Sequence, residues 1–424
     1  MSYTSSLVQP RMVHLIVRDE APLWEQGLFM VWFFTLFLRV PQFSLLMFLC
    51  LLAILGLFVL HVTRTMPSLI KAWPLLIYPV FGLISSGWSA FPGQGIEIGI
   101  LLLITPFVLV TIAVRLPPKL FFRCMTIGGA LATAYLAQPG IQFHGPNAIM
   151  HKQILAYHLL LICVPALVSA VNDEELTIVR VIGLLTAIIA FSLQLVAESV
   201  TSIGLTAVAF IFILGAKFVW VPMAKIAHLR TLLFVFFCAL VCTAALIVLA
   251  MPQNSIVEDA FELVGKDTTL TGRTMIWEYA ELAAESRPIL GQGLGAFWHA
   301  DVGIAASLAE ATHAKPGVNI SFHSVYWEMR VHLGWVGFVV FCCVLLFSIF
   351  LNFRQWLGES SLLNSGLLVM MVVTASTFGT ESYLCGAFDM IVTSFYMGAL
   401  YSMRPGQQRV AVPAVPKLDA EQPI

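Results

Sequence analysis

A histidine and an arginine are the side chains in this sequence best suited to chemistry, and both lie in its one long polar stretch, residues 251–330. An imidazole such as that of His323 is well matched to proton transfer near neutral pH. A guanidinium such as that of Arg273 can bind two phosphate oxygens at once. A lone histidine near a membrane surface is nonetheless commonly a hydrogen-bonded structural residue. The residue types alone therefore leave a catalytic and a structural role for His323 open.

The segment from Gly272 to Ser286 predicts an amphipathic helix that Pro288 ends. Its apolar residues share one face, namely Ile276, Tyr279, Ala280 and Ala283. Its glutamates share the opposite face, namely Glu278, Glu281 and Glu285. Arg273 and Trp277 lie one turn apart on the border between these faces, where a guanidinium and an indole can reach a ligand at the membrane surface. We therefore expect this helix to lie on the membrane spans, with Trp277 as a candidate substrate contact.

The run Gly291-Gln-Gly293-Leu-Gly295 does not have the spacing of a dinucleotide-binding loop, and no buried strand precedes it. It predicts a tight turn whose backbone approaches a membrane-facing ligand, with a plain connecting loop as the alternative. No loop carries the paired acidic motif that would bind a metal-complexed sugar nucleotide. The sequence therefore predicts no nucleotide donor, no cofactor and no metal.

The rest of the chain has the composition of an integral membrane protein. Of its 424 residues, 59% are hydrophobic and only 11% are charged, and the mean hydropathy is +0.91, whereas soluble domains carry about a quarter charged residues. The formal net charge of −1 gives no basic surface for nucleic acid. All eight cysteines lie in or beside apolar runs, which favours buried free thiols over disulfides or a zinc site.

Because a helix needs about 20 apolar residues to cross a bilayer, the sequence predicts an all-α membrane protein of about twelve transmembrane helices. The predicted windows are 24–40, 43–62, 68–88, 96–114, 120–138, 154–171, 178–197, 202–221, 231–250, 333–351, 361–378 and 383–402. The segment before the first window lacks a small-residue cleavage site after a short apolar core, so no removable signal peptide is expected.

The windows divide the chain into five parts with predicted locations. These are a cytoplasmic N-terminal segment (1–23), nine helices (24–250), an external loop domain with the candidate site (251–332), three helices (333–402) and a cytoplasmic tail (403–424). Most of the 22 Lys and Arg residues then lie on the cytoplasmic side, as cationic short loops require. Both termini are therefore expected inside and the long polar loop outside.

Four stretches together resemble the superfamily of O-antigen ligases and of O-antigen or exopolysaccharide polymerases. They are Thr269-Leu-Thr-Gly-Arg-Thr274, Trp277, Arg287-Pro-Ile-Leu-Gly-Gln-Gly-Leu-Gly-Ala-Phe-Trp298 and His323-Ser-Val-Tyr-Trp-Glu-Met-Arg-Val-His-Leu-Gly334. The run Lys266-Asp-Thr-Thr-Leu-Thr-Gly-Arg273 looks most like the exopolysaccharide-polymerase branch. The resemblance implies transfer of a glycan from undecaprenyl diphosphate to a sugar hydroxyl, without a metal, at the periplasmic face of a bacterial inner membrane.

By this resemblance Arg273 holds the diphosphate and His323 activates the acceptor hydroxyl. Arg287 is a second diphosphate candidate, although its place beside a proline suits a structural helix end equally well. Lys152, in the run His151-Lys-Gln153, resembles a phosphate contact of the family, with a lysine that reaches lipid headgroups as the alternative. Glu381, in the run Gly379-Thr-Glu-Ser382, is a candidate to orient the base or bind sugar, or else an ordinary helix-end carboxylate.

The resemblance departs at Ser199-Val200-Thr201, because many relatives carry an arginine between the serine and the threonine. Asp389 lies inside the last window, where a carboxylate is a functional candidate by default; it either lines the floor of the site or pairs with a hydroxyl such as that of Thr393. The residues do not separate a polymerase from a ligase that uses a lipid A core acceptor. A flippase or other transporter is the rival from another class, and a flippase and a chain-length regulator are candidate partners.

Overall fold

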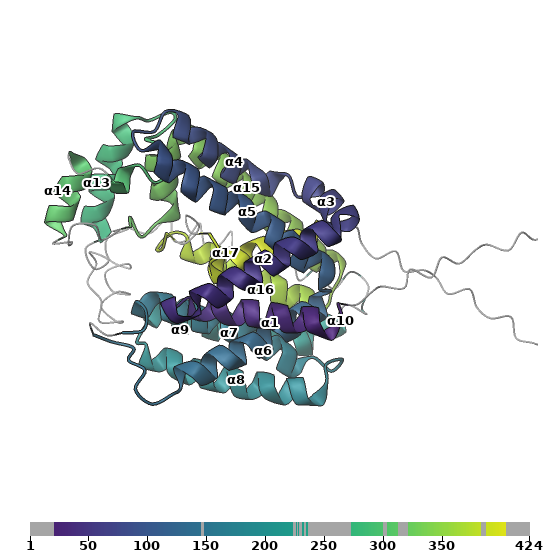
Figure 1. The fold of residues 1–424 in the computed structure, drawn as a ribbon. Helices are drawn as coiled ribbons and strands as arrows, with labels where there is room; N and C mark the ends of the chain where they lie inside the picture. Colours follow the sequence, from purple (N-terminus) through teal and green to yellow (C-terminus); the bar gives the residue numbers. More distant parts are fainter. Residues whose placement is uncertain are drawn as a thin grey trace, which may run out of the picture.

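A computed structural model describes residues 21–145, 148–223, 226, 228, 231–232, 235, 273–299, 303–312, 321–382 and 387–403. Within these ranges every regular element is a helix and no strand occurs (Figure 1), so the all-α expectation is confirmed. Three expected features lie largely outside the described residues: the N-terminal segment, the window 231–250 and the tail. The part of the polar loop before Arg273 lies outside them as well.

The helices follow one another in this order: α1 (Leu23–Leu38), η1 (Pro41–Phe43), α2 (Ser44–Leu60), α3 (Val62–Lys71), α4 (Pro74–Ile84), η2 (Ser85–Gly87), α5 (Pro92–Arg115), α6 (Pro118–Leu136), α7 (Lys152–Val171), α8 (Thr177–Val196), α9 (Val200–Gly215), η3 (Ala216–Trp220), α10 (Val221–Met223), α13 (Arg273–Ser286), η5 (Phe297–His299), α14 (Ile304–Ala311), α15 (Val325–Gly358), α16 (Leu362–Thr377) and α17 (Met390–Ser402).

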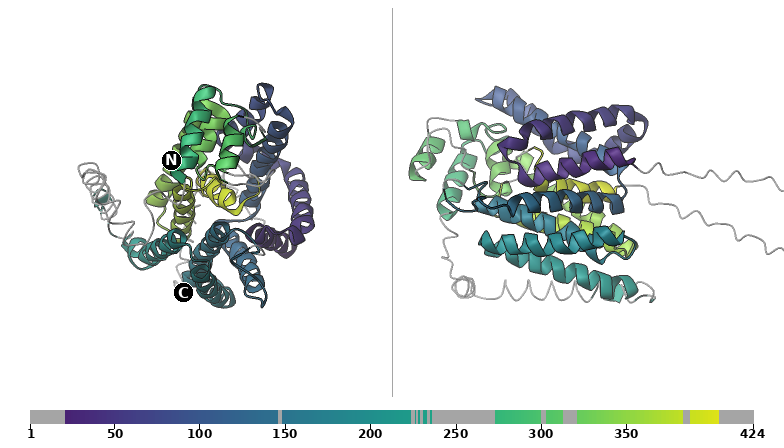
Figure 2. Two further views of the ribbon diagram at one scale, coloured as in Figure 1. Left: turned by 90° about the vertical axis from the view of Figure 1, so that its left-hand side faces the viewer. Right: turned by 60° about the horizontal axis from the view of Figure 1, so that its bottom comes forward.

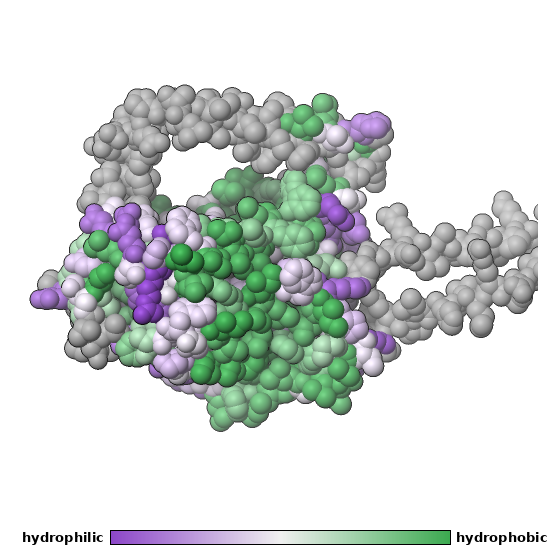
Figure 3. Space-filling view, turned by 90° about the horizontal axis from the view of Figure 1, so that it is seen from above, coloured by the Kyte–Doolittle hydropathy of each residue, from purple (hydrophilic) through white to green (hydrophobic). Residues whose placement is uncertain are grey.

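Most of these helices run side by side along one axis, with α13 and α14 gathered at one end (Figures 1 and 2). Helix α7 lies at the centre and is 83% buried over its apolar window. The outer surface carries many exposed leucine, isoleucine, valine and phenylalanine side chains. Figure 3 shows them as a broad apolar surface between two hydrophilic ends. An apolar surface of this extent marks contact with a membrane or with other proteins, and it agrees with a membrane protein.

Six helices of the described part are long and apolar enough to cross a membrane: Pro41–Leu60, Pro92–Arg115, Lys152–Val171, Thr177–Val196, Val200–Met223 and Val325–Gly358. Helices α3 and α4 together would make a seventh. The apolar helices α1, α16 and α17 are shorter, with 16, 16 and 13 residues. The expected count of about twelve spans therefore stays a prediction.

The window 68–88 is not a single straight helix. Helix α3 ends at Lys71, α4 begins at Pro74, and the two are bent by 81°. Proline has no backbone N–H with which to continue the hydrogen bonds of the preceding helix, and Pro74 is the first residue of α4. The sequence Ala72-Trp73-Pro74 therefore breaks the helix inside an otherwise apolar run.

Helix α15 connects the membrane bundle to the polar end. Its 34 residues would span about 50 Å, well beyond the bilayer core of about 30 Å. The helix is interrupted at Gly334, whose φ is 64° and ψ is −163°. The first part of α15, before Gly334, packs against α13 through a small apolar cluster that includes Ala280, Ala283 and Val331. The amphipathic helix expected from Gly272 to Ser286 is confirmed as α13, with its glutamates exposed.

Candidate active site

Glu381 is the centre of a polar cluster at the α13 end of the bundle. Its Oε1 accepts a hydrogen bond from Nη2 of Arg273 at 2.9 Å, and its Oε2 lies 3.4 Å from Nδ1 of His323. The side chain of Glu381 is 5% exposed, that of Arg273 is 12% exposed and that of His323 is 30% exposed. The structure therefore brings two of the expected site residues, Arg273 and His323, to the buried carboxylate of a third, Glu381.

The backbone around His323 is held on both sides. The indole N–H of Trp277 donates to the carbonyl oxygen of Phe322 at 2.9 Å. The N–H of Ser324 donates to the Ser382 hydroxyl at 3.0 Å. His323 itself has a φ of 49°, in the left-handed region that residues other than glycine seldom adopt. Such a conformation persists where the surroundings fix it, and it is common at functional sites.

This geometry equips His323 for proton transfer. The carboxylate of Glu381 faces Nδ1, so a neutral ring with its proton on Nδ1 keeps Nε2 as the atom that can accept a proton. Glu381 would also stabilise the imidazolium that forms, because an opposite charge nearby favours the charged ring. The contact with Glu381 uses one of the five N–H donors of Arg273, and the others suit the oxygens of an anion.

The first turn of α7 lies beside this cluster. His151 is within electrostatic range of Glu381, His323, Lys152 and Arg273. Partial burial lowers the pKa of His151, the cations and His323 lower it further, and Glu381 opposes them. Lys152 follows His151 as the exposed first residue of α7, and its role as a phosphate contact stays a prediction.

Two residues near the cluster were missed by the sequence reasoning. The hydroxyl of Tyr157, one turn into α7, shares a hydrogen bond with the side chain of Thr380 and lies near Glu381 and Arg273. His151 was quoted only as a neighbour of Lys152. The available signal was that His151, Lys152 and Tyr157 lie close together in sequence at the start of α7. It could be used only once the first turn of α7 was known to lie at this site.

Arg287 lies outside the cluster around Glu381. Its Nη1 donates to the backbone carbonyl of Trp88 at 3.1 Å, and its side chain is exposed. No contact joins it to Glu381 within the part of the chain that the structure describes. The contact with Trp88 fixes the end of α13 against the turn before α5, so a helix-end role is visible, and a diphosphate contact stays a prediction.

The glycine-rich run forms a tight turn, as expected, but its backbone approaches protein and not a ligand. Gly291 and Gly293 have φ values of 68° and 99°. A Cβ on Gly291 would lie 2.5 Å from the backbone of His332, and one on Gly293 would lie 2.5 Å from Cβ of Ser89. The expectation of a ligand-facing backbone is therefore corrected: the turn docks between α15 and the loop before α5.

Asp389 has a partner different from the one expected. Its Oδ2 accepts a hydrogen bond from Nη1 of Arg39 at 2.8 Å, and its Oδ1 caps α17 by accepting the N–H of Ile391 at 2.7 Å. The ring of His158 lies 3.9 Å from the same carboxylate. The hydroxyl of Thr393 is therefore not its hydrogen-bond partner, because the nearby guanidinium provides a stronger, charge-assisted contact.

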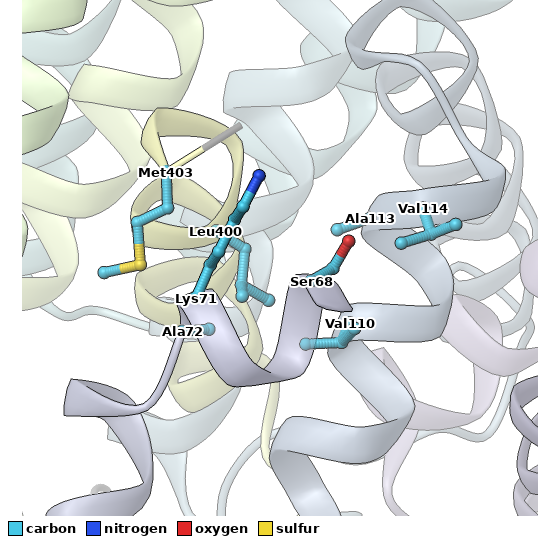
Figure 4. A pocket seen from close by; sticks show the side chains of 8 residues that line it. All are labelled: Ser68, Lys71, Ala72, Val110, Ala113, Val114, Leu400 and Met403. Carbon is cyan, nitrogen blue, oxygen red and sulfur yellow. The ribbon is translucent and has the colours of Figure 1, made fainter. Parts of the chain in front are cut away.

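A hollow between α3, α5 and α17 lies at the end of the bundle opposite α13 (Figures 1 and 4). It is lined by Ser68, Lys71, Ala72, Val110, Ala113, Val114, Leu400 and Met403, and none of these is an expected site residue. Within the described residues, no three His, Cys, Asp or Glu side chains come close enough to hold a metal ion.

Comparison with known proteins gives two matches. Residues 182–342 match the O-Antigen ligase family, a range that contains Arg273, Arg287 and His323 but not Lys152 or Glu381. The chain is also 26% identical over 296 residues to the exopolysaccharide production protein ExoQ of Rhizobium meliloti (strain 1021). That match covers 67% of this chain and 66% of the relative, slightly less than two thirds of its length. The two matches agree with the resemblance drawn from the motifs, and they support a relationship to the superfamily of O-antigen ligases and polymerases.

Proposed function

We propose that this chain is a membrane glycosyltransferase that joins lipid-linked oligosaccharide units of an exopolysaccharide or O-antigen. The observation that carries the proposal is the cluster in which buried Glu381 holds both Arg273 and His323. A diphosphate is already a good leaving group, so a protein needs only to position the reactants, neutralise charge and remove one proton. The similarity to a protein named for exopolysaccharide production favours polymer formation.

In the proposed step, the donor glycan is linked through its anomeric carbon to undecaprenyl diphosphate. The acceptor hydroxyl oxygen forms a bond to that carbon while the bond from the carbon to the diphosphate oxygen breaks, and the electron pair leaves with the diphosphate. Nε2 of His323 takes the hydroxyl proton and the ring becomes an imidazolium beside Glu381. Arg273 neutralises the charge on the departing diphosphate. The step as written uses no metal.

The other expected site residues take supporting roles in the proposal. Lys152 lies at the edge of the cluster and is a further diphosphate contact, in place of the arginine that many relatives carry near Val200. Arg287 is a more distant candidate for the same role. Since the N–H of Trp277 is engaged by Phe322, this residue would bind sugar through the face of its ring.

In the proposed arrangement about twelve helices cross a bacterial inner membrane, both termini are cytoplasmic and the cluster faces the periplasm. The apolar surface between two polar ends supports a bundle that spans a membrane (Figure 3). Arg64, Lys71 and Arg123 lie at the end remote from the cluster, as cytoplasmic cations should. A Glu285→Cys variant tests the orientation, because its thiol on α13 should react with a membrane-impermeant maleimide added to spheroplasts. Reaction only after lysis would place the cluster in the cytoplasm.

A ligase is the nearer alternative, and the match to the O-Antigen ligase family favours it. It uses the same donor but transfers the glycan to a lipid A core sugar. Mass spectrometry of glycans from a deletion strain separates the two. A product with a single repeat unit indicates loss of a polymerase, whereas long chains left on the lipid carrier indicate loss of a ligase.

Transport is the alternative from another class, and the feature that favours it is the buried Asp389 with its neighbours His158, which is also buried, and Arg39, which is exposed. The deciding experiment is reconstitution of the full chain in liposomes that contain a lipid-linked repeat unit and no ion gradient. Longer glycans together with released undecaprenyl diphosphate would establish transfer. Movement of the donor between leaflets without any new glycosidic bond, from folded protein, would contradict it.

A further inference from the structure

Glu328, in the first turn of α15, is a buried carboxylate that the proposed reaction does not use. It is 2% exposed. Its Oε1 accepts the N–H of Phe322 at 3.0 Å, and its Oε2 accepts the indole N–H of Trp298 at 3.1 Å and lies 2.9 Å from Nε2 of His332. One carboxylate therefore joins the loop of His323, the turn that follows α13, and α15 itself.

His332 completes this network. The residue is 2% exposed, and while Nε2 faces Glu328, Nδ1 lies 3.3 Å from the carbonyl oxygen of Gly293. The N–H groups of Phe322 and Trp298 only donate, so Glu328 accepts from both of them. The ring of His332 therefore links Oε2 of Glu328 to the backbone of Gly293.

Backbone hydrogen bonds also tie the glycine-rich turn to α15. The N–H of Gly293 donates to the carbonyl oxygen of His332 at 2.9 Å, and the N–H of Gln292 donates to that of Val331 at 3.0 Å. The N–H of Trp335 donates to the carbonyl oxygen of Pro288 at 2.8 Å, across the break at Gly334. The turn and the first part of α15 therefore form one rigid support next to the loop of His323.

This support reaches His323 through Phe322. Glu328 holds the N–H of Phe322, and Trp277 holds its carbonyl oxygen. Both polar backbone groups of the residue before His323 are therefore fixed by side chains. His323 follows directly in the left-handed region, and a residue in that region needs its neighbours to be held.

We propose that Glu328 is a positioning residue for His323, and that His332 holds the Glu328 side chain in place. By fixing the backbone of Phe322, Glu328 directs Nε2 of His323 toward the acceptor hydroxyl. The inference rests on the proposed function, because the orientation of the His323 ring matters only if that ring takes a proton.

Glu328→Gln in the full-length protein is the first test. The amide keeps the shape but turns one acceptor oxygen into an NH2 donor that faces the N–H groups already there. We expect kcat for glycan transfer to fall about 10- to 100-fold, since a misplacement of about 1 Å has that effect. The KM for the lipid-linked donor should stay within about twofold, because Arg273 is unchanged. Wild-type kcat in this variant overturns the proposal.

Two further variants separate positioning from misfolding. Trp298→Phe removes one N–H from the same carboxylate and leaves the bond to Phe322, so it should lower kcat less than Glu328→Gln does and should insert normally. Glu285→Gln changes a carboxylate on the exposed face of α13 and should leave kcat unchanged. If Glu328→Gln fails to insert, Glu328→Asp takes its place, because it keeps the charge but withdraws the carboxylate from the N–H of Phe322. Wild-type kcat in that variant overturns the proposal.

Carbethoxylation of His323 by diethyl pyrocarbonate, mapped by mass spectrometry of peptides from membranes, gives a readout that needs no glycan. Glu328→Gln should raise the rate at His323 and leave the rate at the exposed His144 unchanged. An unchanged rate at His323 overturns the proposal. Absence of transfer by wild-type protein would instead count against the proposed function, and the labelling rates would still decide whether Glu328 positions His323.

Discussion

Glu25 and Glu381 are both buried carboxylates that bind an arginine from a distant part of the chain, but they do so at opposite ends of the bundle. Glu25 is 2% exposed, and its two oxygens accept hydrogen bonds from Nε and Nη2 of Arg115 at 2.7 and 3.0 Å. Arg115 is itself only 6% exposed. Glu381 instead divides its oxygens between Arg273 and His323, and His323 keeps 30% of its side chain exposed.

The difference distinguishes a structural ion pair from a site that can take a ligand. A bidentate pair satisfies both oxygens of Glu25 and leaves Arg115 buried with its partner. At the other end, the described contacts engage one guanidinium nitrogen of Arg273 and one ring nitrogen of His323. These contacts leave the other guanidinium nitrogens of Arg273 and Nε2 of His323 for a ligand. The following predictions test whether this contrast in geometry corresponds to a contrast in function.

The largest effect is expected from His323→Ala. Loss of the only imidazole that contacts Glu381 in the described part of the chain removes the proton acceptor, and transfer should fall by about 10³-fold. The measurement is chain growth on a lipid-linked donor in liposomes, normalised to folded protein. Normal polysaccharide from cells that carry this variant would remove His323 from catalysis.

Arg273→Ala should have the next largest effect. Removing a cation that stabilises the departing diphosphate should reduce transfer by about 10²- to 10³-fold. Arg273→Lys keeps the charge but not the planar fork, so it should recover only part of the loss. If the lysine variant and the alanine variant were equally inactive while donor binding stayed normal, Arg273 would act by holding Glu381 and not by holding phosphate.

Arg287→Ala should reduce transfer less than Arg273→Ala does. Its guanidinium is exposed and holds a backbone carbonyl of Trp88, a contact of the kind that contributes about 1 kcal/mol. Arg287→Lys is the matched variant. Steady-state kinetics with the lipid-linked donor measure the effect, and a loss as large as that of Arg273→Ala would show that Arg287 reaches the diphosphate.

Much of the helical scaffold could be predicted because bilayer thickness fixes the length of an apolar helix. The windows 154–171, 178–197 and 202–221 match α7, α8 and the run from α9 to α10 within a few residues. The bend inside the window 68–88 was not predicted, because composition does not report direction: Pro74 bends an apolar run without making it less apolar. The 3.6-residue period likewise found α13, whose buried face the structure reproduces.

The candidate site was predictable in its residues but not in its contacts. Arg273 and His323 stand out by type and motif, whereas their common partner Glu381 lies 108 and 58 residues away in sequence and is brought there by packing alone. The same holds for Asp389, whose partner Arg39 is 350 residues distant. The glycine-rich turn shows a second limit of sequence reasoning. The glycines indicate a close approach of the backbone to a neighbour, but they do not indicate whether that neighbour is protein or ligand.

The smallest effect on transfer is expected at Glu25 and Arg115. Arg115→Ala leaves a buried carboxylate without its partner and should cost about 3–5 kcal/mol of stability, seen as a lower unfolding temperature in detergent. Transfer per folded molecule should stay at the wild-type level, because this pair lies at the other end of the bundle. The double variant Glu25→Gln/Arg115→Met removes both charges and should regain most of the stability. If Arg115→Ala lowered transfer in protein of normal stability, the two ends of the bundle would be coupled. A carboxylate with both oxygens bound by one arginine would then no longer indicate a purely structural pair.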